Sequence, residues 1–74
     1  MGEIMDILMM DGCTRREAEK YLRNGTRVFD GVQEYAENLE ADGIAVPEDL
    51  ENMIMSGRCA DVHYVDGYVI EYVM

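Results

Sequence analysis

The stretch Thr26–Asp42, TRVFDGVQEYAENLEAD, has the clearest two-sided pattern in this chain of 74 residues. Apolar side chains recur along it at the three- and four-residue steps of one helix face. Acidic side chains fall between them at i, i+4 and i+7, and so share the opposite face. The pattern predicts one helix with a buried side and a row of carboxylates. The apolar positions are Val28, Phe29, Val32, Tyr35, Ala36 and Leu39, and the acidic ones are Asp30, Glu34 and Glu37.

Two shorter helices are predicted before this stretch. The apolar spacing from Ile4 to Met9, through Met5 and Leu8, predicts the first, and Gly12 follows its end as a left-handed residue. The next start signal is a capping box, in which Thr14 and Glu17 each bond the backbone N–H of the other. A second helix therefore begins directly after Thr14, with Ala18, Tyr21 and Leu22 facing inward.

The junction at Gly25 has two interpretations. Asn24-Gly25 is typical of a turn, and Thr26 could cap a new helix. However, an unbroken apolar spacing runs across it from Ala18 to Leu39, as in one continuous helix. A Schellman stop would also favour an apolar residue where Thr26 stands. The sequence leaves a break and a continuous helix equally open.

The next helix boundaries have clearer signals. Gly43 follows Asp42 and precedes Ile44, which can contact Leu39 as in a Schellman stop. Pro47 is suited to the first turn of a further helix, which Ser56-Gly57 ends. The predicted inner face of that helix consists of Leu50, Met53 and Ile54.

The C-terminal segment changes to a period of two. Residues 62–65 and 68–73 flank Asp66-Gly67, which predicts a β-hairpin with Val65 opposite Tyr68 and His63 opposite Ile70. Because both faces are apolar, the hairpin must dock on helices, gain a partner strand, or both. One face holds Ala60, Val62, Tyr64, Val69 and Val73, and the other holds His63, Val65, Tyr68, Ile70 and Tyr72.

These elements predict an α+β fold in one domain, residues 1–74. It is a small helical bundle of three to four helices within residues 3–56, with a C-terminal two-stranded antiparallel β-hairpin at residues 60–73. A chain of this length is near the size at which a single core is only marginally sufficient.

Charge is unevenly distributed along the chain. The net charge is −10, yet residues 1–27 are balanced, and residues 28–74 carry eleven acidic side chains against Arg58 alone. So acidic a protein should avoid nucleic acid and anionic lipid and favour a basic protein surface. Acidic side chains with no lysines between them repel one another, which costs free energy. Charge that serves solubility alone does not require this segregation.

The residue inventory argues against an enzyme. There is one histidine, and the chain has no glycine-rich phosphate loop and no serine in a nucleophile context. Cys13, Cys59 and His63 are too scattered for zinc, so we expect no metal and no cofactor. The two cysteines are expected to be reduced thiols, and His63 an ordinary strand residue. No segment is typical of a signal peptide or a membrane span, which predicts a soluble cytoplasmic protein.

Part of the chain resembles ubiquitin-associated domains. The resemblance lies in the spacing of glycine, alanine and leucine from Gly12 to Leu22, which corresponds to the first loop and second helix of those domains. Phe29, Val32 and Tyr35 would then match their third helix. The resemblance implies a compact three-helix bundle; it does not extend to ubiquitin binding, because Cys13 replaces the bulky residue expected after the glycine.

The whole chain is also similar to small acidic proteins of phages and mobile elements, most clearly from Ile4 to Ala18. Some of these inhibit host defence, including anti-CRISPR proteins that imitate DNA at a basic site. This resemblance implies an inhibitor in the host bacterial cell that occupies the nucleic-acid-binding site of a host protein. The expected partner-binding residues are Asp30, Glu34, Glu37, Glu40, Glu48, Asp49 and Glu51.

Two other interpretations stay open at this point. The acidic face can serve solubility alone. The hairpin face with Tyr68, Ile70 and Tyr72 is either covered by the helices or forms a self-association patch, tyrosine being favoured in such places. The alternative function is therefore an oligomerising adaptor, a homodimer associated through the hairpin and the apolar helix stripe.

Overall fold

The computed structural model describes residues 2–73 and has an α+β fold. Within those residues it contains four helices and one three-stranded antiparallel sheet, in the strand order β1-β3-β2. In chain order the elements are α1 (Gly2–Met10), α2 (Arg15–Arg23), β1 (Arg27–Phe29), α3 (Val32–Ala41), α4 (Leu50–Met55), β2 (Val62–Val65) and β3 (Tyr68–Glu71).

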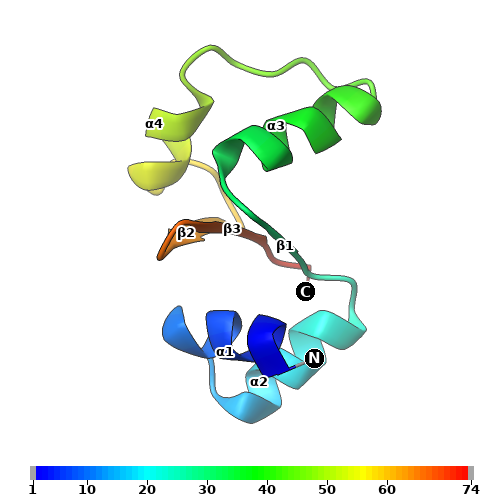
Figure 1. Cartoon of the computed structure of the whole chain (residues 1–74), viewed down its shortest axis with the longest axis vertical. Coiled ribbons are helices and arrows are strands. Elements are labelled where there is room, and N and C mark those ends of the chain that lie inside the picture. The colour runs from blue at the N-terminus through cyan, green and yellow to red at the C-terminus, as the bar shows by residue number, and fades with distance from the viewer. Residues whose placement is uncertain (1, 74) are drawn as a thin grey trace.

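The sheet lies between two pairs of helices (Figure 1). The α1–α2 layer, residues 2–25, covers one face, and the α3–α4 layer, residues 30–58, covers the other. The central strand β3 supplies both cores, because successive side chains point to opposite faces. Val69 is fully buried against the α3–α4 layer and Ile70 against the α1–α2 layer.

The predicted hairpin register is confirmed. Val65 pairs with Tyr68 and His63 with Ile70. The hairpin is supported in both expected ways: its second face docks on α1 and α2, and the sheet gains a third strand beside β3. That strand, β1, was not predicted; it pairs with β3 through Val28 opposite Ile70.

The prediction of one helix over Thr26–Asp42 is wrong in its first part. Arg27–Phe29 is a strand, and the helix begins at Val32. Gly31, with φ 101°, redirects the chain between them. Phe29 therefore reaches the α3–α4 core as a strand residue, so it does not match the third helix of a ubiquitin-associated domain. As strand residues, Val28 and Phe29 point to opposite faces of the sheet, and both faces are covered, so this apolar pair fits a strand as well as it fits the apolar spacing of a helix.

The open question at Gly25 is settled in favour of a break. Gly25 has φ 105°, and its N–H donates to the Leu22 carbonyl at 3.2 Å. The Thr26 N–H donates to the Tyr21 carbonyl at 3.0 Å, which completes a Schellman motif. Thr26 is polar at this position because its buried hydroxyl accepts the Val73 N–H at 2.8 Å. A tertiary hydrogen bond thus replaces the expected apolar contact.

Replacing Thr26 by valine should show how much the hydrogen bond between the Val73 N–H and the Thr26 hydroxyl contributes to stability. Valine keeps the shape but removes the acceptor, so the partly buried Val73 N–H loses its partner, at a cost of about 1–3 kcal/mol. Thr26→Ser keeps the hydroxyl and is the matched control. Amide hydrogen exchange should show Val73 losing protection in the valine variant only; equal exchange in both variants would contradict the assignment.

The other helix ends follow the sequence with two differences. The capping box at Thr14 and the stop at Gly43 are confirmed, with the Ile44 N–H donating to the Leu39 carbonyl at 2.9 Å. However, α4 begins at Leu50, because Pro47 accepts the Leu50 N–H in a tighter i→i+3 turn. In α1 the buried side chains are Ile7 and Leu8, whereas Ile4 and Met9 are exposed.

Candidate functional site

The α3–α4 layer carries most of the net charge. Its residues 30–58 contain eight acidic side chains and one basic side chain, Arg58. All eight carboxylates belong to exposed residues. Arg58 Nη2 lies 4.0 Å from Asp49 Oδ2. The α1–α2 layer, residues 2–25, has five acidic and four basic side chains. The sheet therefore separates a nearly neutral layer from a strongly acidic one.

The predicted partner-binding residues all lie in the α3–α4 layer, but not on one helix. Glu34, Glu37 and Glu40 lie in α3. Asp30 lies in the turn before α3, where its N–H donates to Glu34 Oε2 at 2.9 Å. The predicted helical row beginning at Asp30 is therefore wrong, because Asp30 precedes the helix. The remaining three are Glu48 and Asp49, in the turn before α4, and Glu51, in the first turn of α4.

The predicted self-association patch is covered for the most part. Ile70 is fully buried, Tyr72 is 8% exposed, and Tyr68 is half-buried against α1 and α2. Of the two interpretations left open, coverage by the helices describes Ile70 and Tyr72. Ile70 is therefore inaccessible to a second copy of the folded chain, and Tyr72 is accessible only where it lines a pocket beside Asp11.

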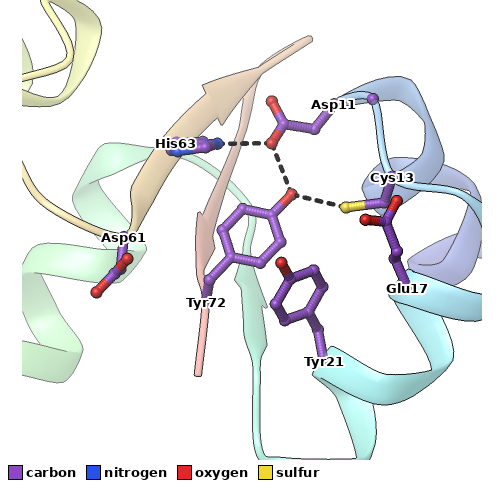
Figure 2. Close-up of a pocket in the computed structure, with 8 residues that line it drawn as sticks. Asp11, Cys13, Glu17, Tyr21, Asp61, His63 and Tyr72 are labelled. Atoms are coloured by element: carbon purple, nitrogen blue, oxygen red, sulfur yellow. Dashed lines mark hydrogen bonds and ion pairs between the residues drawn. The ribbon is translucent and has the colours of Figure 1, made fainter. Parts of the chain in front are cut away.

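A pocket of about 180 Å³ opens at the turn between α1 and α2 (Figure 2). The turn contributes Asp11, Gly12 and Cys13 to its wall, and α2 contributes Glu17 and Tyr21. The opposite wall comes from the sheet side, residues 61–72. Residues from the two ends of the chain therefore meet here.

Asp11 is the centre of a hydrogen-bond network in this pocket. Its Oδ2 accepts the Tyr72 hydroxyl at 2.6 Å and lies 2.7 Å from His63 Nδ1. The Cys13 thiol lies 3.5 Å from the same hydroxyl. Burial raises the pKa of Tyr72, and the hydrogen bond to the Asp11 carboxylate raises it further, because a phenolate there would face a negative charge. The network holds the α1–α2 turn against β2 and the end of β3.

Aromatic rings form much of the remaining wall. The Tyr21 and Tyr72 ring centroids are 4.9 Å apart in an edge-on arrangement, and those of His63 and Tyr72 are 5.0 Å apart. Edge-to-face pairs of this kind stabilise by roughly 0.5–1.5 kcal/mol beyond the area they bury. Tyr72 is the shared partner, so its ring is fixed in place.

The opposite face of the sheet has a related arrangement. The Tyr35 hydroxyl donates to Glu71 Oε2 at 3.2 Å, and Arg27 donates to Glu71 Oε1 at 2.8 Å. Burial, followed by the neighbouring Glu71 carboxylate, raises the pKa of Tyr35 to about 12. Each core therefore ends in a tyrosine bonded to a carboxylate.

Sequence reasoning missed the cluster around Asp11. The predicted hairpin register does place His63 and Tyr72 on one face of the sheet, so the sequence indicates that these two members of the cluster lie on the same side. Asp11 was interpreted only as part of a helix end, and no sequence pattern shows that this turn docks beside His63, 52 residues later. Among the residues that the structure describes, no group of three His, Cys, Asp or Glu side chains is arranged to hold a metal ion.

Comparison with protein-family models, curated proteins and solved structures found no match. None of the helices within residues 2–73 is long and apolar enough to cross a membrane.

Proposed function

We propose that this protein is a non-enzymatic binding protein whose acidic α3–α4 layer docks on a basic protein surface. The observation that carries the proposal is the separation of charge by the sheet. The α3–α4 layer has a net charge of −7 and the α1–α2 layer has a net charge of −1, although each layer has an outer surface of exposed residues. A protein that needed charge only for solubility could distribute it over both layers.

The internal contacts of the acidic layer support a binding role. Residues three apart on a helix, such as Glu37 and Glu40, have Cβ atoms about 5–6 Å apart, so their carboxylates can together enter a groove that binds a nucleic-acid backbone. Neither residue forms an ion pair with any described residue. Glu34 is different, because its carboxylate accepts the Asp30 N–H at the start of α3.

The resemblance to small acidic phage proteins extends this proposal to a partner class. The partner would be a host nucleic-acid-binding protein in the bacterial cytoplasm, and this chain would inhibit it as a DNA mimic of the anti-CRISPR kind. The protein itself would not bind nucleic acid, because its net charge of −10 repels phosphates.

Charge reversal on α3 tests the proposal. The double variant Glu37→Lys/Glu40→Lys should reduce capture of the partner from a bacterial lysate by at least about tenfold, since lost attraction is replaced by repulsion. Glu3→Lys/Asp6→Lys makes the same change at the same spacing on α1 and is the matched control. Wild-type capture should also weaken steeply as salt is raised.

The comparison of the two variants decides the outcome. Circular dichroism first establishes that both are folded. Equal capture by the α3 variant and the wild type, or equal loss in the α1 control, would contradict a role for this layer.

A further inference from the structure

The pocket beside Asp11 is separate from the acidic layer, since the sheet lies between them. It is open to solvent, and its ionisable lining groups are acidic apart from His63, which already contacts the Asp11 carboxylate at 2.7 Å. The carboxylates of Asp11 and Glu17 lie beside the Tyr21 and Tyr72 rings, whereas the Asp61 side chain points away from them (Figure 2), and no lysine or arginine is among the described lining residues. The site therefore disfavours anions and favours a positive charge.

The rings add a second and independent property. Tyr21 and Tyr72 present aromatic surface to the same hollow in which the Asp11 and Glu17 side chains lie (Figure 2). Aromatic faces attract ammonium and guanidinium groups through the ring quadrupole. Carboxylates bond the N–H groups of the same cations. The carboxylates and the aromatic rings of the pocket therefore both favour ammonium and guanidinium groups.

The carboxylates keep acceptor capacity for a ligand. The contacts of Asp11 with Tyr72 and His63 both use Oδ2, and Glu17 accepts the Thr14 N–H through Oε1 at 2.9 Å. Each carboxylate therefore retains a second oxygen that forms no hydrogen bond within the described chain. The Asp11 network also fixes the Tyr72 ring before any ligand arrives, so binding orders few side chains.

The size of the pocket limits the ligand. Its volume of about 180 Å³ is below the roughly 300–1,000 Å³ of common small-molecule sites. A nucleotide or other large cofactor does not fit, whereas one cationic head group does.

We propose that the pocket formed by Asp11, Glu17, Tyr21 and Tyr72 binds an ammonium or guanidinium group. Such a group comes either from a lysine or arginine side chain of a partner protein or from a free small amine. The proposal does not depend on the acidic layer, because the two surfaces share no residue.

A nitrogen-15 NMR titration tests it. Ethylammonium or ethylguanidinium is added at constant ionic strength, with sodium chloride as the matched salt and acetate as the anionic probe. We expect saturable shifts at the amides of Gly12, Cys13 and His63 with either cation and none with acetate. Shifts that do not saturate, or that occur instead at α3 and α4, would overturn the site.

A variant that keeps the fold isolates the charge. Glu17→Gln retains the capping interaction with Thr14 but removes one carboxylate charge, so cation affinity should fall about two- to fivefold. Glu19→Gln is the control on the same helix, since Glu19 pairs with Arg15 and does not line the pocket. Unchanged affinity in Glu17→Gln, or equal loss in both variants, would contradict the proposal.

A further titration, with a peptide as the probe, identifies the source of the cation. A neutral peptide with a single central lysine or arginine is compared with the free amine in the same titration. At least tenfold tighter binding of the peptide assigns the site to a partner side chain, and equal affinity assigns it to a free amine. No saturable binding of either probe would overturn the proposal.

Discussion

Replacing Ile70 by alanine is expected to destabilise the protein by about 2–5 kcal/mol, because it removes a fully buried side chain from the central strand. Ile70 pairs with Val28 on one side and His63 on the other, and packs against the α1–α2 layer. A domain of this size has a total stability of roughly 4–11 kcal/mol, so the loss is a large fraction of it.

Urea unfolding at neutral pH measures this loss. The midpoint should fall while the slope of free energy against urea stays unchanged, since the same surface is exposed on unfolding. Ile44→Ala is the matched control: Ile44 is 51% exposed, and its replacement should change the free energy of unfolding by no more than about 0.5 kcal/mol. Similar losses in the two variants would show that the α1–α2 core is not organised on β3.

The hairpin was predictable because its signals are local. Asp66-Gly67 fixes a two-residue turn, and the turn then fixes every cross-strand pair, including His63 opposite Ile70. The capping box at Thr14 is local in the same sense. Such features need no knowledge of what the segment packs against.

The third strand was not predictable from local pattern. Arg27–Phe29 has only three residues, too few to distinguish a strand period from a helix period. Its conformation is decided by pairing with β3, more than forty residues later, and by the break at Gly25. As a result, Asp30 lies outside the helical row of carboxylates, and the Glu34 carboxylate accepts its N–H at 2.9 Å. The distribution of charge in the sequence predicts the acidic layer, but not which of its carboxylates form hydrogen bonds within the chain.

The protein is also expected to lose stability steeply in base, between about pH 10 and about pH 12. Burial, and then the Glu71 carboxylate, raise the pKa of Tyr35 from 10.0 to about 12. Burial and the hydrogen bond to Asp11 shift the pKa of Tyr72 in the same direction. Below pH 10 both tyrosines are protonated in the folded and unfolded states, so their contribution is fully present.

Above that pH the unfolded chain releases protons that the folded chain retains. The unfolded state then binds fewer protons, and the free energy of unfolding falls as pH rises. Each tyrosine contributes a slope of at most about 1.4 kcal/mol per pH unit, so two together can remove several kcal/mol. Urea midpoints measured across this range, with tyrosinate absorbance recorded in parallel, give the slope directly.

Phenylalanine variants assign that slope to particular side chains. Tyr35→Phe and Tyr72→Phe both lose a hydrogen bond at neutral pH, but each should have a shallower decline above pH 10, because one shifted group is gone. Tyr64→Phe is the control, since Tyr64 is 40% exposed and lies outside both networks. Its alkaline slope should equal that of the wild type. If the Tyr35 and Tyr72 variants also kept the wild-type slope, the two buried tyrosine–carboxylate pairs would not be the source of the alkaline instability.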